Sequence, residues 1–334
     1  MCGIAGFFSK RHSADARRVT VETMVEHQRH RGPEYQRVVN IGSATLGHAR
    51  LKIVDLDERS NQPFVSRNHR YTITFNGEIY NYQYLRKLLL SQGVNCLTTS
   101  DTEVLLELYT IYGSGVLAFL EGMYSFAIYD AIEEAWFCAR DPLGEKPFYY
   151  ATGAAGDFAF SSELSATALV ISDRSNLNTN ALIFFLSAGY VKGPQTLHSN
   201  IYQLQPGHFL IIENGQPPKL EQYWSGVYSE HSPAKNQSEH IVKFNRQLQQ
   251  SIISTIPNDV PFAAFLSGGL DSSYIVNTIM KSNQVHHAFE AYILDFDNAD
   301  YSEYPIAQKT ALMLGVKLNR VRYSEHSEDL TKII

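Results

Sequence analysis

The chain has 334 residues, of which 44% are hydrophobic and 19% are charged, and its formal net charge is -6. This length allows two domains with cores of their own, since a domain usually contains roughly 100–200 residues. A negative net charge argues against binding to nucleic acid or to an anionic membrane, because both favour clustered Lys and Arg. Three cysteines are too few for a disulfide framework or a four-ligand zinc site, so we expect a cytoplasmic protein.

The first part of the chain, to about residue 224, contains short runs of Val, Ile, Tyr and Phe separated by Gly, Asn and Asp, which is typical of β-strands. Apolar residues at three- and four-residue spacing predict helices at 82–92 and 102–112. The clearest strands are predicted at 71–75, 125–129, 135–139, 147–151 and 158–161. This mixture of sheets and helices predicts an α+β sandwich.

A third apolar segment, residues 181–191, is shorter than the ~20 residues that a membrane-spanning helix requires. We therefore predict that it forms a buried helix.

A polar segment at 225–237 predicts a linker, and a second domain follows at 238–334. Its first helix is predicted at 241–256. The elements that follow are predicted as a strand at 260–266, a glycine loop, a helix at 272–280, a strand at 288–294 and a helix at 303–314. Alternating strands and helices favour a parallel, doubly wound α/β sheet.

Cys2 directly follows Met1, so removal of Met1 would leave a thiol and a free α-amino group on the same residue. An α-amino group has a reference pKa of about 7.7–8.0, close enough to neutrality to accept the proton of the thiol. Nucleophile and general base would then be supplied together.

Several ordered motifs accompany this cysteine. They include Cys2-Gly3-Ile4-Ala5-Gly6, His30-Arg31-Gly32-Pro33, Gly47-His48-Ala49-Arg50-Leu51, Phe75-Asn76-Gly77-Glu78 and Ser100-Asp101-Thr102-Glu103. With them the sequence resembles the N-terminal-nucleophile (type 2) glutamine amidotransferases, most closely the glutamine-hydrolysing asparagine synthetases. The resemblance covers residues 1–224 and implies an αββα sandwich for this domain.

The resemblance implies a role for each matching residue. Cys2 would attack the carboxamide of L-glutamine, and Asn76 and Gly77 would stabilise the oxyanion through a side-chain amide and a backbone N–H. Arg50 would hold the α-carboxylate of glutamine, a task that suits a planar guanidinium. The remaining residues of the implied glutamine site are Glu78 and Asp101, which would bind its ammonium group, and Leu51, Lys52, Ile53 and Val54, which would line the pocket. Ser100 and Glu103 also have the spacing of a helix capping box.

A second motif, at residues 265–273, follows an apolar strand and opens a helix, the setting in which a glycine loop binds phosphates. It resembles the pyrophosphate loop of the ATP pyrophosphatases. By this resemblance the ATP site consists of Leu266, Ser267, Gly268, Gly269, Asp271, Ser272 and Ile293. Asp271 would also bind Mg²⁺.

The resemblance as a whole implies an ATP-dependent ligase that uses glutamine-derived ammonia to amidate L-aspartate through an aspartyl-AMP intermediate. The family's synthetase half continues beyond position 334, so the second domain is expected to be a truncated, incomplete α/β sheet with exposed apolar surface. Three alternatives stay open: a glutaminase that works alone or with a partner, a relative that amidates another carboxylate, and a non-catalytic glutamine- or ATP-binding remnant. A homodimer and a completing partner chain both remain open.

Overall fold

The computed structural model describes residues 1–153, 156–170, 176–213, 216–226, 236–282, 289–296, 300 and 302–323. The chain forms two compact units, Met1–Ser229 and Glu230–Ile334. Most of the predicted linker, at 227–235, lies outside the described residues.

In the described part of the first unit, the strands form two six-stranded antiparallel sheets. The first sheet has the order β10 (Ile201–Gln203), β8 (Tyr149–Thr152), β9 (Phe158–Ser161), β1 (Gly3–Phe8), β3 (Ala44–Arg50) and β2 (Tyr35–Ile41). The second has the order β12 (Lys219–Gln222), β11 (His208–Glu213), β7 (Ala135–Arg140), β6 (Gly122–Asp130), β5 (Tyr71–Ile79) and β4 (Phe64–Val65). The predicted strands at 71–75, 125–129, 135–139 and 158–161 fall within these elements, and the strand predicted at 147–151 overlaps β8 but begins two residues before it.

Strand β1 shows how the sheets stack. Its side chains alternate between its two faces: Ile4 and Phe8 pack with Trp136 between the sheets, whereas Phe7 packs with Val21 of the helix outside. All six residues of β1 are buried. The strand therefore lies at the centre of the unit and holds the residue before it, Cys2, in a fixed place.

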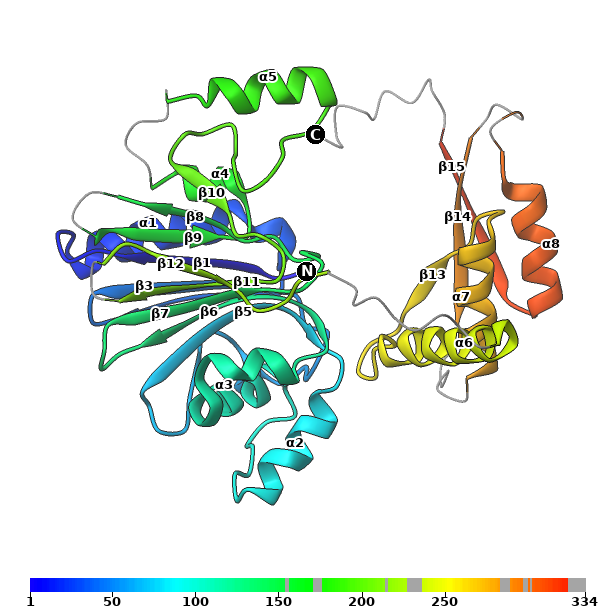
Figure 1. Cartoon of the computed structure of the whole chain (residues 1–334), viewed down its shortest axis with the longest axis horizontal. Helices are drawn as coiled ribbons and strands as arrows, with labels where there is room; N and C mark the ends of the chain where they lie inside the picture. The colour runs from blue at the N-terminus through cyan, green and yellow to red at the C-terminus, as the bar shows by residue number, and fades with distance from the viewer. Residues whose placement is uncertain are drawn as a thin grey trace. The chain divides into compact units, whose positions relative to one another are not determined.

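Helices cover the outer faces of both sheets (Figure 1). Helix α1 (Ala14–His27) and the short α4 (Leu164–Ala168) pack on the first sheet, and α2 (Tyr82–Ser91) and α3 (Asp101–Tyr112) lie over the second. Short 3-10 helices occur at Arg29–Arg31, Glu58–Ser60 and Gly113–Phe119. The predicted αββα sandwich is confirmed, as are the helices at 82–92 and 102–112 to within one residue.

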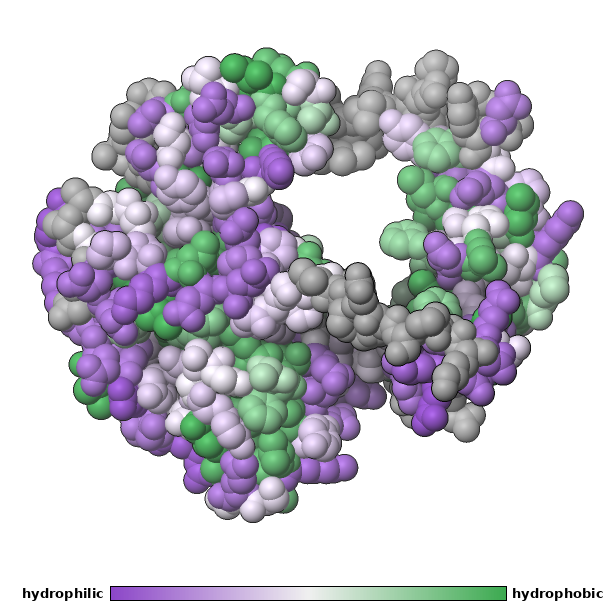
Figure 2. Space-filling model, viewed as in Figure 1, coloured by the Kyte–Doolittle hydropathy of each residue, from purple (hydrophilic) through white to green (hydrophobic). Residues whose placement is uncertain are grey.

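The prediction of a buried helix at 181–191 is wrong in its burial. Helix α5 (Thr179–Ala188) forms there, capped by Asn178 and ended by Gly189 with positive φ, but Ala181 alone of its residues is buried. The side chain of Leu186 is 75% exposed. Figure 2 shows hydrophobic side chains gathered over α5, which lies outside the sandwich. An apolar helix is buried only where a second surface packs against it. The described part of the first unit provides little such surface for α5.

In the described part of the second unit, three parallel strands pair in the sequential order β13 (Ala263–Phe265), β14 (Glu290–Phe296) and β15 (Lys317–Tyr323). Helices α6 (Gln237–Ser254), α7 (Leu270–Lys281) and α8 (Tyr304–Leu314) complete the unit. The parallel sheet is confirmed, and β15 is a strand that the sequence reading did not predict.

The prediction of a doubly wound sheet is wrong for the described residues. Sequential strand order with crossovers of one hand places both connecting helices on the same face. Ile293 and Leu266 pack in the core beneath these helices, while Phe265 is 80% exposed and Leu294 52% exposed on the other face. The exposed apolar surface expected for this domain is therefore present.

No helix in the described ranges of the chain has both the length and the apolar character needed to cross a membrane.

Candidate active site

Cys2 lies beside the residue that follows strand β3. The Leu51 N–H points to the Cys2 sulfur at 3.4 Å, and the thiol lies 3.6 Å from the Leu51 carbonyl oxygen. The carbonyl oxygen of Cys2 accepts a hydrogen bond from Arg31 Nε at 3.0 Å. The half-buried nucleophile is thus held from both its backbone and its side chain.

Burial raises the pKa of the Cys2 thiol above its ordinary value, and the Leu51 N–H and the positive charge of Arg50 oppose that shift. A thiol with a raised pKa stays protonated near neutral pH. Attack on a carboxamide therefore needs a base close to the sulfur, the role predicted for the α-amino group of Cys2.

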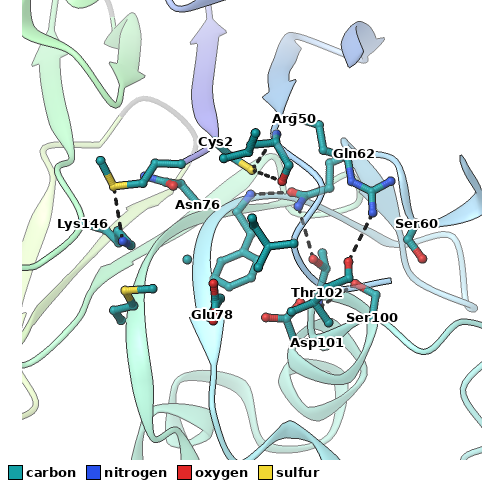
Figure 3. Close-up of a pocket in the computed structure, with 17 residues that line it drawn as sticks. Cys2, Arg50, Ser60, Gln62, Asn76, Glu78, Ser100, Asp101, Thr102 and Lys146 are labelled. Atoms are coloured by element: carbon teal, nitrogen blue, oxygen red, sulfur yellow. Dashed lines mark hydrogen bonds between the residues drawn. The ribbon is translucent and has the colours of Figure 1, made fainter. Parts of the chain in front are cut away.

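A pocket with a volume of about 160 Å³ opens beside the thiol (Figure 3). Its walls come from the start of β1, the segment after β3, the end of β5 and the start of α3. The lining consists of Met1, Cys2, Arg50, Leu51, Ile53, Val54, Ser60, Gln62, Phe75, Asn76, Gly77, Glu78, Ser100, Asp101, Thr102, Met123 and Lys146. Every residue predicted for the glutamine site is in this lining except Lys52, whose backbone N–H donates to Glu34 at 2.5 Å.

Asn76 and Gly77 stand at the end of strand β5. The Asn76 side chain is 1% exposed, and its amide nitrogen and oxygen have no hydrogen-bond partner among the described residues. Because a buried amide without a partner costs free energy, its place in a pocket wall fits a group that awaits a ligand. At Gly77, an added Cβ would lie 2.2 Å from the Met123 carbonyl oxygen, so the close pairing of β5 with β6 requires glycine there.

Asp101 and Glu78 bring two carboxyl groups to the pocket. Burial raises the pKa of Asp101 to about 7. The hydrogen bond from the Ile79 N–H opposes this rise, and the negative charge of the nearby Glu78 adds to it. Burial also raises the pKa of Glu78. Neither carboxyl group forms an ion pair with another residue that the structure describes, so the two suit the binding of an ammonium group, whose charge would favour their ionised forms.

Helix α3 is capped as predicted by Ser100, whose hydroxyl accepts the Thr102 N–H at 3.1 Å. The second half of the predicted capping box is wrong. The Glu103 carboxylate instead accepts the N–H groups of Leu97 and Thr98 at 2.8 and 2.6 Å, because the preceding loop folds back over the helix start. These bonds fix the loop and hence the position of Asp101.

Arg50 also lies in the pocket wall, but its terminal nitrogens donate to the loop that follows it. One nitrogen donates to the Asp57 carbonyl at 2.9 Å and to Asn61 Oδ1 at 2.6 Å, and the other to the carbonyl groups of Val54 and Asp55. Arg50 thus shapes the loop that carries Leu51, Ile53 and Val54.

Sequence reasoning missed five polar lining residues: Gln62, Thr102, Ser60, Lys146 and Ser100, the last of which was predicted only as a helix cap. Lys146 is buried, and its Nζ lies 3.4 Å from the Met1 sulfur. Burial lowers the pKa of Lys146, and the negative charges of Glu145 and Glu78 oppose this shift. Thr102 stands within the motif Ser100-Asp101-Thr102-Glu103, but its residue type by itself did not indicate a pocket position.

The glycine loop of the second unit lies between β13 and α7, with Leu266 and Ile293 in neighbouring buried positions. The Ser267 and Ser272 hydroxyls lie 2.8 Å apart, and Ser267 Oγ accepts the Gly269 N–H at 3.2 Å. Gly269 caps α7 without a side-chain hydrogen bond, so the first N–H groups of this twelve-residue helix remain available to an anion.

The residues of this loop fit a phosphate ligand with Mg²⁺. Asp271 is exposed in the first turn of α7. In the part of the chain that the structure describes, no cluster of three or more His, Cys, Asp or Glu side chains could hold a metal ion. A lone carboxylate is sufficient for Mg²⁺, which in nucleotide sites is bound largely by phosphate and water.

Two facing antiparallel sheets between helical layers, with a cysteine at the start of a central strand and an amide-lined pocket beside it, define the N-terminal-nucleophile amidotransferase fold. The chain belongs to the glutamine amidotransferase domain family, which matches residues 1–224. The asparagine synthase family matches residues 243–334.

Relatives and a solved structure agree with this assignment. Asparagine synthetase (glutamine-hydrolyzing) 1 of Bacillus subtilis is 31% identical over 100% of this chain and 52% of its own length. Amidase chyE of Penicillium rubens is 28% identical over 98% of this chain and 51% of its own. The chain thus spans about half the length of these curated relatives. The B. subtilis glutamine phosphoribosylpyrophosphate amidotransferase shares the fold, with a TM-score of 0.50 and 18% identity over 95% of this chain and 65% of its own.

Proposed function

We propose that the first unit hydrolyses L-glutamine to glutamate and ammonia at Cys2, as the glutaminase of an ATP-dependent asparagine synthetase. The observation that carries this proposal is the shared pocket of Cys2, the unpartnered amide of Asn76, and the acid Asp101. This set supplies a nucleophile, a donor for an oxyanion and a counter-charge for an ammonium group.

The reaction would begin with removal of Met1, which frees the α-amino group of Cys2. This amine takes the thiol proton, and the thiolate attacks the side-chain carbonyl carbon of glutamine. The Asn76 amide and the Gly77 N–H would stabilise the oxyanion, and donors of this kind each contribute about 3–4 kcal/mol. The α-ammonium group then returns its proton to the departing nitrogen, which leaves as ammonia, and water hydrolyses the thioester to glutamate.

Asp101 and Glu78 would hold the α-ammonium group of glutamine at the far end of the pocket, and Arg50 would hold its α-carboxylate. Both terminal nitrogens of Arg50 already donate to the loop. We therefore propose that Arg50 acts on the carboxylate through its remaining N–H, or after the loop at residues 54–61 has moved.

The second unit would bind ATP on its glycine loop. Ser267, Gly268, Gly269 and Ser272 would surround the phosphates, Leu266 and Ile293 would lie nearest the adenine, and Asp271 would hold Mg²⁺. Mg²⁺ would neutralise phosphate charge when ATP is bound. The acceptor of the ammonia is proposed to be L-aspartate, with another carboxylate as the alternative, because relatives named as asparagine synthetases and as an amidase match this chain.

A second candidate function is a glutaminase that depends on a completing partner. The exposed apolar face of the second unit favours it, since Phe265 and Leu294 would be covered in a complete domain.

The activities of the two units can be measured separately, because the first unit would produce glutamate and the second would produce pyrophosphate. The purified chain is incubated with glutamine, with and without ATP and aspartate, alongside Cys2→Ala and the control Cys96→Ala, whose cysteine lies outside the pocket. Glutamate formation that is lost only in Cys2→Ala supports the glutaminase. Pyrophosphate and asparagine in addition support the full synthetase, and glutamate without them supports the partner-dependent glutaminase. No glutamate from the parent chain would support a non-catalytic remnant.

A further inference from the structure

Strand β5 has one complete edge and one open edge. It pairs with β6 along its whole length, from Tyr71 to Ile79. On its other side, in the described part of the chain, β4 covers only Thr72 and Ile73. The segment that carries Asn76 and Gly77 therefore has no strand beside it on that edge.

Side chains take the place of the missing strand. The N–H of Phe75 donates to Gln62 Oε1 at 2.7 Å, and four residues further on, the N–H of Ile79 donates to Asp101 Oδ2 at 3.1 Å. The backbone N–H groups of an antiparallel strand alternate between its edges, so Gly77 directs its N–H to this same edge. Gly77 lies midway between the two bonded amides, in the pocket wall.

The carbonyl group of Phe75 is also held by a side chain. Its carbonyl oxygen accepts a hydrogen bond from His48 Nε2 at 3.1 Å. Burial lowers the pKa of His48 to about 3, so the ring is neutral and its single N–H must lie on Nε2 to make this bond. The backbone immediately before Asn76 is thus fixed by Gln62 on its N–H and by His48 on its C=O.

Both edge contacts lead back to the start of α3. Gln62 Nε2 donates to Thr102 Oγ1 at 3.2 Å, and Asp101 is the preceding residue. Gln62 is 5% exposed and Thr102 is 3% exposed, so water does not compete strongly for these bonds. The open edge of β5 is consequently tied to the helix start on each side of Gly77.

We infer that Gln62 is a positioning residue for the oxyanion site: by holding the Phe75 N–H, it sets the direction of the Gly77 N–H and of the Asn76 side chain. This inference rests on the proposed glutaminase. In this role Gln62 does not contact the reacting atoms. A substitution of Gln62 should therefore weaken stabilisation of the transition state and leave glutamine binding largely unchanged.

Gln62→Met tests this role because methionine fills a similar volume without a hydrogen-bonding group. Loss of one oxyanion donor costs roughly 10²–10³ in kcat, and a donor that is kept but misdirected should cost less, about tenfold to thirtyfold. We expect kcat for glutamate release to fall by that factor, while KM for glutamine changes less than about threefold. Gln36→Met is the matched control, since Gln36 donates to the Gly32 carbonyl at 2.6 Å outside the pocket.

Glutamate γ-semialdehyde provides a readout that a merely structural role would not move. It forms a tetrahedral adduct with a thiol and so depends on the same donors as the reaction. We expect its inhibition constant to rise by the factor by which kcat/KM falls. A parallel rise of KM, or an unchanged inhibition constant, would overturn the inference. An inactive parent chain that also fails to bind the aldehyde would instead refute the proposed glutaminase, and the role of Gln62 with it.

Thr102→Val keeps the test decisive if Gln62→Met does not fold. It removes the acceptor of Gln62 Nε2 and leaves Gln62 Oε1 free to bond Phe75. We expect a smaller loss, about threefold in both kcat and aldehyde affinity. A change confined to glutamine KM would contradict the positioning role.

Discussion

Asp101 Oδ2 accepts the backbone N–H of Ile79 at 3.1 Å, so a carboxylate in the pocket wall also completes the edge of strand β5. Asp101 therefore has a structural contact through one oxygen and a charge that is available to a ligand. Substitution by asparagine separates these properties, because the amide oxygen can still accept the N–H of Ile79 while the charge is lost.

Asp101→Asn is expected to raise KM for glutamine about 10- to 100-fold with kcat changed less than about threefold. A hydrogen bond to a charged group contributes about 1.5–3 kcal/mol, and each 1.4 kcal/mol is about tenfold in affinity. Steady-state release of glutamate measures both constants. Asp15→Asn, on the exposed first turn of α1, is the control and should leave KM unchanged. An unaltered KM in Asp101→Asn would exclude Asp101 from ammonium binding.

The pKa of Asp101 predicts how stability depends on pH. Burial raises this pKa from 3.8 to about 7, so between these values the native state holds a proton that the unfolded chain releases. This stabilisation is complete below about pH 4 and is lost as pH rises through about 7. The free energy of unfolding of the parent chain, relative to that of Asp101→Asn, should thus fall between about pH 4 and about pH 7.

Denaturant unfolding followed by tryptophan fluorescence can measure this difference. The two tryptophans, Trp136 and Trp224, both belong to the first unit and report its unfolding alone. A difference that does not change with pH would mean that Asp101 is already ionised in the native state at low pH.

Much of this site could be predicted because its chemistry lies in contiguous motifs. Asn76, Gly77 and Glu78 are consecutive, and Cys2 and Arg50 stand in short sequences of their own, so residue type and order were sufficient. The role of Gln62 could not be predicted in the same way. Its contacts join positions 13 and 40 residues away in the sequence, and only the folded chain brings them together.

The errors of the sequence reading have a common physical cause. Local composition predicted that α5 is a helix and that β13 and β14 are parallel strands, and these predictions are confirmed. The partner of each apolar surface depends on distant parts of the chain, so the burial of α5 was predicted wrongly, and the described strands of the second unit have helices on one face and not on both. Periodicity identifies an apolar face, whereas tertiary contacts decide what covers it.

Gly77→Ala should lower kcat for glutamine hydrolysis about 100-fold or more, since the oxyanion donor must move with the strand. A Cβ at this position would lie 2.2 Å from the Met123 carbonyl oxygen, and a backbone atom cannot rotate out of the way. Gly115→Ala is the matched control, because a Cβ there would lie 4.0 Å from its nearest neighbour, Tyr112 Cβ. Retention of kcat by Gly77→Ala would remove the Gly77 N–H from the mechanism.

Two consecutive residues of β14 lie on opposite faces of the sheet in the second unit, so substitutions at them should differ in their effect on stability. Ile293 is 4% exposed beneath the helices, and Leu294 is 52% exposed on the opposite face. Ile293→Thr should lower the free energy of unfolding of the second unit by about 2–3 kcal/mol, because it removes buried methyl groups and buries a hydroxyl. Leu294→Thr should change it by less than about 0.5 kcal/mol.

Hydrogen exchange of peptides from the second unit, measured in the whole chain, distinguishes the two variants. Leu294→Thr should also reduce the binding of a hydrophobic dye, since it removes part of the exposed apolar face. Protection that falls equally in both variants would mean that Leu294 is packed against another surface in solution. A second copy of the chain could supply that surface, and in that case the loss of protection in Leu294→Thr should depend on protein concentration.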